Sequence, residues 1–174
     1  MSALRLINET SCTDVTSVSI TDVFSADFDI YKITATNQVG SGSGLMRFIN
    51  SSGSSISSAS YDEALLVMNM NTAFAESRAT NQTAFSNSMV AENPTGNNNN
   101  GQVEMTIFNP YSTSSYTFGI SMNRVYNSST AMRGGKAIGV LKTTDRVTGF
   151  QIYSDTSNYF SSTIRTYGLR VDNG

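Results

Sequence analysis

The sequence predicts an all-β protein in which residues 1–174 form one antiparallel β-sandwich domain of a jelly-roll-like kind. Apolar and polar residues alternate with a period of two from end to end, which is typical of strands with one buried face. Helix signals are sparse, and short polar turns separate the alternating segments at even spacing. These observations favour a sandwich over a fold in which helices alternate with strands.

The N-terminal strands are predicted from short alternating segments. They lie at residues 4–7, 15–20, 28–36 and 45–49. Residues 1–10 are interpreted as the first strand or as a docking arm. The stretches 40–44 and 50–55 are rich in glycine and serine, a composition typical of the turns that end strands.

The segment 61–74 is ambiguous because its apolar run fits both a helix and a fully buried strand. Asp62 and Glu63 near its start would suit the N-terminal end of a helix dipole. The run lies between serine-rich turns and a second polar loop, however, as a strand of the core would. We therefore favour a strand.

Two strands are predicted in the middle of the chain, at residues 103–109 and 116–122. In the first, the apolar face consists of Val103, Met105 and Ile107. Phe108 lies on its other face, which predicts that a loop or a neighbour covers it. In the second, one face carries Tyr116, Phe118, Ile120 and Met122. This is the pattern of a half-buried strand whose apolar face packs inward.

The C-terminal strands are predicted at residues 136–141, 146–153 and 163–171. In the last of them, we expect Tyr167, Leu169 and Val171 to face inward and Thr166 and Arg170 to face outward. The preceding residues 133–136 read Arg-Gly-Gly-Lys, but the spacing and the following alanine do not fit a phosphate-binding loop. They are interpreted as a hairpin or the entrance to a strand.

The composition excludes several classes of function. The chain has 11 basic and 13 acidic residues, a net charge of −2, so it has no clustered basic face for nucleic acid. It has no histidine, which removes Ser-His-Asp and Cys-His catalysis and histidine-ligated metal sites. Its single cysteine, Cys12, cannot form an intrachain disulfide and is interpreted as a partly buried filler. We expect no catalytic residue and no cofactor.

The sequence shows no targeting signal. Its N-terminus lacks the apolar stretch of a secretory signal, and no window of about 18 residues is apolar enough to span a membrane. We expect a protein that is made in a host cytoplasm and has no membrane partner.

The acidic residues give two weak candidates for chemistry. Asp27 and Asp29 lie on one side of an extended segment, with Asp22 nearby, where carboxylates would be able to hold Ca²⁺. No Asp-x-Asp-x-Asp-Gly loop is present, so solvated carboxylates are the favoured interpretation, and no metal site is predicted. Asp62 and Glu63 resemble half of an acid/base pair for glycoside cleavage, but the sequence nominates no partner across a cleft.

Two polar segments are candidates for exposed contacts. The first is the loop crown with Asn97, Asn98, Asn99 and Asn100, and the second runs from Tyr111 to Tyr116. Tyrosine and serine together are typical of adaptable binding surfaces. The alternative interpretations are a tolerant loop for the first segment and strand ends that pack on their own sandwich for the second.

Much of the chain resembles a family of virion proteins. The segments concerned are 41–53, 64–74, 105–111 and 163–174. They resemble small structural proteins of marine tailed phages, including cyanophages. The resemblance implies a jelly-roll-like sandwich on the virion surface, as a capsid decoration (cement) protein or a fibre module, assembled as a homotrimer. It supplies no catalytic residue.

We therefore expect a non-enzymatic virion protein that docks on the head shell and stabilises it. Its partners would be the major capsid protein or other virion proteins, and Leu4, Leu6 and Ile7 are the candidate docking residues. The alternative is a tail or head fibre module whose loops around Asn97 and Tyr111 recognise host surface glycans. The sequence leaves head and tail locations open.

Overall fold

The computed structural model describes residues 3–40, 44–86, 101–126, 132–154 and 159–170. Regular structure in these segments consists of eleven β-strands. All neighbouring strands are antiparallel, and the strands form two sheets that pack as a sandwich. The prediction of an all-β, antiparallel, sandwich-like single domain is confirmed.

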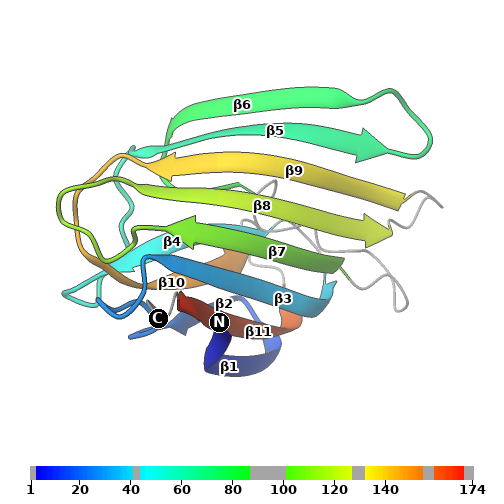
Figure 1. Ribbon diagram of the computed structural model, residues 1–174. Helices are drawn as coiled ribbons and strands as arrows, with labels where there is room; N and C mark the ends of the chain where they lie inside the picture. The colour runs from blue at the N-terminus through cyan, green and yellow to red at the C-terminus, as the bar shows by residue number, and fades with distance from the viewer. Residues whose placement is uncertain (1–2, 41–43, 87–100, 127–131, 155–158, 171–174) are drawn as a thin grey trace.

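The two sheets differ greatly in size. The large sheet contains β1 (Ala3–Val15), β3 (Ile30–Gly40), β5 (Tyr61–Asn69), β6 (Ala75–Gln82), β7 (Gly101–Phe108), β8 (Thr117–Tyr126), β9 (Met132–Leu141) and β11 (Phe160–Arg170). Their order is β1-β11-β3-β7-β8-β9-β5-β6. The small sheet contains β2 (Ser17–Ile20), β10 (Val147–Ser154) and β4 (Gly44–Asn50), in that order. Figure 1 shows the large sheet in front, from β6 at the top to β1 at the bottom, with the small sheet behind its lower part.

The chain passes repeatedly between the two sheets. It leaves the large sheet for β2, returns in β3, leaves again for β4 and returns in β5. The same happens at β10, after which β11 enters the large sheet between β1 and β3. Because neighbouring strands in space come from distant parts of the sequence, the two sheets form one cooperative unit.

The segments predicted as strands all contribute to strands, and the interpretation of 61–74 as a strand is confirmed by β5 over its first part. Residues 133–136 lie inside β9, as the strand interpretation predicted. β6 was not predicted. It reads AESRATNQ, and nearly all of its side chains are exposed because it is an edge strand without a buried face. Such a strand has no hydrophobic alternation to detect.

A cluster of aromatic rings fills the space between the sheets. Its members are Phe24, Phe28, Tyr31, Phe48, Tyr61, Phe85 and Phe150. Neighbouring ring centroids are 4.7 to 6.4 Å apart, mostly edge to face. Edge-to-face pairs at this spacing add to the stabilisation from buried area. The cluster therefore joins both sheets and the connections that cross between them.

Tyr61 satisfies two backbone groups within this cluster. Its hydroxyl accepts a hydrogen bond from the Phe48 N–H at 3.0 Å and donates one to the Ile56 carbonyl at 3.0 Å. Phe48 lies on β4, an edge strand of the small sheet, and Tyr61 lies on β5 of the large sheet. Burial raises the pKa of the Tyr61 hydroxyl, so it stays protonated and can donate.

We expect Tyr61→Phe to destabilise the protein by about 1–3 kcal/mol, because it leaves a buried N–H and a buried carbonyl without a partner. Urea unfolding at one fixed protein concentration measures this. Tyr116→Phe, at an exposed ring, is the control and should change stability by less than about 0.5 kcal/mol. Equal effects of the two variants would contradict the role given to the buried hydroxyl.

The aromatic cluster leaves little room beneath β8 and β9. The middle of their inward side carries small residues, namely Thr117, Gly119, Ser121, Gly135, Ala137 and Gly139. At Gly139 a Cβ atom would lie 2.6 Å from Cε1 of Phe85, so the ring occupies the place of a side chain. Larger inward residues, Val125 and Leu141, lie only toward the ends of the two strands. In the middle of both strands the larger residues therefore face away from the core.

This arrangement corrects the predicted orientation of two strands. On β8, Phe118, Ile120 and Met122 share a face as predicted, but that face is exposed. On β11, Thr166 is buried and Tyr167 lies on the opposite face, the reverse of the prediction. The reason is similar in both strands, because the ring of Phe28 lies 2.6 Å from the Cβ position of Gly168. Val171 lies outside the described residues.

We expect Gly139→Ala to cost about 1–3 kcal/mol, because the added methyl group overpacks the interior against Phe85. Phe85→Leu should also destabilise, through the cavity that it leaves. The double variant should lose less than the two single losses combined, since the smaller side chain makes room for the methyl group. Strict additivity in urea unfolding would show that the two residues do not compete for this space.

Candidate interaction surface

The surface of the large sheet that faces away from the small sheet is here called the outer face. Its centre is β8, where Phe118, Ile120 and Met122 are 45%, 41% and 52% exposed. Cross-strand partners share a face of a sheet, so the pairing places other apolar residues beside them. Ile120 is paired with Ile138 of β9, and Phe118 with Phe108 of β7.

The apolar surface continues over several strands. A shallow groove of about 540 Å³ crosses β7, β8, β9 and β5, with Phe108, Phe118, Ile120, Ile138 and Val140 among its lining residues. A second groove of about 360 Å³ is lined by Met122, two residues from Ile120 along β8, and by Met70, Phe74 and Met132. Phe108 is half-buried and is paired with Phe118 on the neighbouring strand.

This apolar surface is larger than the largest apolar patch of a typical monomer. Its large, exposed members are Leu66, Met70, Phe74, Phe118, Ile120, Met122, Tyr126, Met132 and Ile138. At about 200 Å² for each large side chain, their exposed fractions leave on the order of 900 Å² open. The largest apolar patch of a typical monomer is about 300–600 Å². The outer face therefore has the size of an interface.

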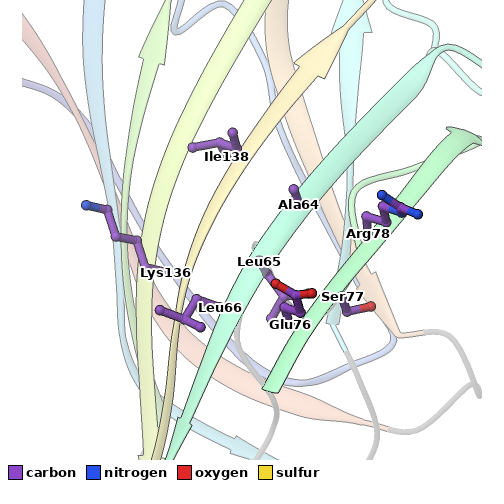
Figure 2. Close-up of a pocket in the computed structure, with 8 residues that line it drawn as sticks. All are labelled: Ala64, Leu65, Leu66, Glu76, Ser77, Arg78, Lys136 and Ile138. Atoms are coloured by element: carbon purple, nitrogen blue, oxygen red, sulfur yellow. The ribbon is translucent and has the colours of Figure 1, made fainter. Parts of the chain in front are cut away.

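Charged residues surround the apolar centre. A third groove, of about 510 Å³, lies over β9, β5 and β6 and is lined by Ala64, Leu66 and Ile138 together with Glu76, Arg78 and Lys136 (Figure 2). On the other side of β8, Lys32 Nζ lies 3.0 Å from Glu104 Oε2, and Arg165 Nε lies 2.6 Å from Glu9 Oε2. Both signs of charge occur on both sides.

The candidate docking residues of the N-terminal strand divide between two faces. Leu4 and Leu6 are each 50% exposed and are paired with Leu169 and Tyr167 of β11. Ile7 is half-buried and packs against the core, after which the pairing is irregular between Leu6 and Asn8. Docking through Ile7 stays a prediction, and in this structure its half-buried side chain packs on the sandwich itself.

The predicted tyrosine contacts lie between β7 and β8. Tyr111 is half-buried, and the Arg146 guanidinium carbon lies 4.7 Å from the centre of its ring. Tyr116 is exposed and directly precedes β8. Residues Asn97, Asn98, Asn99 and Asn100 lie outside the described residues. The structure thus supports exposure for Tyr116 and gives Tyr111 a partner within the chain.

The two adjacent carboxylates of β5 point to opposite faces. Asp62 accepts a hydrogen bond from the Asn81 N–H at 2.7 Å, and its Oδ2 lies 2.9 Å from Lys142 Nζ. These contacts, the Asn81 bond first, hold the pKa of Asp62 below its ordinary value of 3.8. Glu63 is buried and accepts a hydrogen bond from the Ser86 N–H at 3.0 Å. The pair therefore has structural partners and does not face a common substrate gap.

Other candidate groups are placed as follows. Asp27 and Asp29 are exposed, and the described residues contain no group of three or more acidic or cysteine side chains able to hold a metal ion.

Cys12 is half-buried, as predicted, and its thiol donates to the Ser162 carbonyl at 3.6 Å. Burial raises the pKa of this thiol. Within the described segments, no helix is long and apolar enough to cross a membrane.

The outer face was missed by sequence reasoning, although a signal for it was present. Gly119 and Ser121 alternate with Phe118, Ile120 and Met122, and the neighbouring β9 alternates in the same way. Small residues that alternate with large ones in two adjacent strands leave open which face is the inner one. The answer depends on the volume of the layer that packs against them.

Comparisons of this chain with protein families, with curated proteins and with solved structures found no match.

We expect Asp62→Asn to lower the thermal unfolding midpoint slightly at pH 7. A carboxyl group whose pKa is depressed on folding stabilises the folded state above its unfolded pKa, and this contribution is lost as the pH falls through the folded pKa. The difference from the parent protein should therefore shrink as the pH is lowered from 3.8 and vanish below the folded pKa of Asp62. Asp145→Asn, at an exposed loop position, controls for the loss of a surface charge. A difference that persists in acid would contradict this account.

Proposed function

We propose that this protein is a non-enzymatic structural protein of a tailed-phage virion, a capsid decoration (cement) protein that docks on the head shell and stabilises it. The observation that carries the proposal is the outer face, an apolar surface of interface size on a sheet. Such surfaces on soluble proteins mark sites of association. The assignment to a virion rests on the resemblance of the sequence to structural proteins of tailed phages.

The arrangement of polar groups supports a function through binding. Asp62 and Glu63 belong to opposite faces of β5 and are engaged by Lys142 and by the Ser86 N–H. Two of the grooves on the outer face have apolar side chains at their centre. A surface of this kind stabilises what it covers by removing apolar area from water, at about 25 cal/mol per Å² as an upper bound.

The docking end of the proposed cement protein is β1. It is an edge strand that is paired only with β11, so the N–H and carbonyl groups along its other edge are open to another strand. Leu4 and Leu6 on the same strand are exposed and would enter apolar pockets of the partner. Strand addition combines backbone hydrogen bonds with pockets for alternate side chains. The partner would be the major capsid protein or another virion protein.

A fibre or receptor-binding module is the second candidate, and one observation favours it. Tyr116 and Tyr159 present exposed rings, 45% and 61% open, on a chain rich in hydroxyl and amide groups. Tyrosine rings supply flat apolar area with a polar tip, which suits a sugar ring. In this alternative, host surface glycans would be the ligand.

Cryo-electron microscopy of the phage particle that carries this protein distinguishes the candidates. Density repeated across the head shell would support the cement protein, and density at the tail or fibres alone would replace it with the receptor-binding module. Absence of the protein from the particle would overturn both.

The docking strand is tested by adding purified variants to particles that lack the protein. Leu4→Asp/Leu6→Asp should lower the number of bound copies at least tenfold, because buried charges without partners oppose docking. Ser17→Asp/Ser19→Asp adds two charges at exposed positions of β2, outside the docking strand, and should bind normally. Normal binding of the leucine variant would show that β1 is not the docking strand.

A further inference from the structure

We infer that the outer face binds a second copy of this chain, in a two-fold homodimer in which β8 of one copy lies over β8 of the other. This goes beyond the proposed function, because it names a second copy as the occupant of the outer face, leaves β1 free to dock on the shell, and differs from the homotrimer that the resemblance implies. It rests on the same outer face as the proposed function but is tested separately, because the dimer would form from the purified chain without any particle. The area, the distribution of charge and the position of the apolar centre each support this occupant.

The area fits a pair of identical faces. About 900 Å² of large apolar side chains is open on the outer face, by the same estimate of about 200 Å² each. A standard stable interface buries about 800 Å² on each partner. A two-fold interface uses the same patch on both copies, so one such face is sufficient for a closed dimer.

The charges on this face are complementary to themselves. One cross-strand row passes through Met122 and reads Glu9, Arg165, Thr34, Glu104, Met122, Lys136, Leu66, Glu76. A two-fold axis along β8 places each position opposite its mirror position in the same row. Glu104 then meets Lys136 of the second copy, and Arg165 meets Glu76. Glu9, on the edge strand β1, has no mirror position and is held by Arg165 of its own chain.

The contact nearest to the axis is the one between Glu104 and Lys136 of the second copy. These two residues are the cross-strand partners of Met122 on its two sides, so the contact occurs twice in the dimer. Lys136 has no ion-pair partner among the described residues, whereas Glu104 holds Lys32 through Oε2. The row repeats the same complementarity farther out, between Arg165 and Glu76.

The neighbouring rows agree with this axis. In the next row, Ile120 lies on the axis, and Thr106 faces Ile138 of the second copy. On the other side of Met122, Arg124 lies on the axis as well. Its Nη2 donates to Gln102 Oε1 at 2.6 Å, which draws the guanidinium group toward β7. The two copies of Arg124 are thereby turned away from each other.

The balance of charge argues against a strongly charged partner. Lys32, Arg78, Arg124, Lys136 and Arg165 lie on this face together with Glu9, Asp62, Glu76 and Glu104. A nucleic acid or an anionic membrane would require one sign of charge to dominate. A second copy of the face requires both signs in matched positions, which is what the row through Met122 provides.

Sedimentation equilibrium of the purified chain over a range of concentrations tests the inference. We expect a mass of twice 18.7 kDa that dissociates on dilution. Ile120→Glu places two like charges against each other at the axis and should weaken the dimer at least tenfold. Ser19→Glu, at an exposed position of β2 in the small sheet, should leave the dimer unchanged. Circular dichroism and thermal unfolding verify that both variants are folded.

Charge exchange identifies the specific contact. Glu104→Lys and Lys136→Glu should each weaken the dimer by about tenfold or more, since like charges across an interface are costly. The double variant restores opposite charges across the axis and should recover much of the affinity. A monomer at all concentrations, a trimer, or a dimer unaffected by Ile120→Glu would overturn the inference. Failure of the double variant to recover would overturn the two-fold arrangement about β8.

Discussion

The aromatic cluster between the two sheets is the constraint on which the rest of the structure depends. The three strands of the small sheet cover a sheet of eight, so the space between them must be filled from few positions. Large rings from β4, β10 and the connecting segments fill it. The strands that face these rings, β8 and β9, have small residues opposite them. Interiors are close-packed, so a ring such as Phe85 and a side chain at position 139 cannot occupy the same volume.

The exposed apolar face follows from that constraint. β8 and β9 alternate small and large residues, and the small ones are required beneath the aromatic rings. Their larger residues, Ile120 and Ile138 among them, are consequently left on the other side of the sheet. A monomer leaves this area in water, so the packing of the interior also accounts for the apolar surface that we propose as an interface.

The two edge strands of the large sheet differ in polarity. β6 carries Glu76 and Arg78 and is polar on both sides, which disfavours edge-to-edge pairing at that end. β1 at the opposite edge exposes Leu4 and Leu6. The outer face therefore exposes apolar side chains in two separate places, around β8 at its centre and on β1 at its edge.

The sequence by itself determined the fold class and the position of most strands, because alternation with a period of two is a local property of the chain. It also determined the absence of histidine and of a disulfide, and so excluded the corresponding sites. It did not reveal β6, which buries no face, and it assigned the wrong inner face to β8 and β11. Which of two alternating faces is buried depends on the volume of the layer opposite, and the matched charges about Met122 come from strands far apart in the chain. Both were decided by the tertiary structure, because they are properties of packing and of cross-strand register.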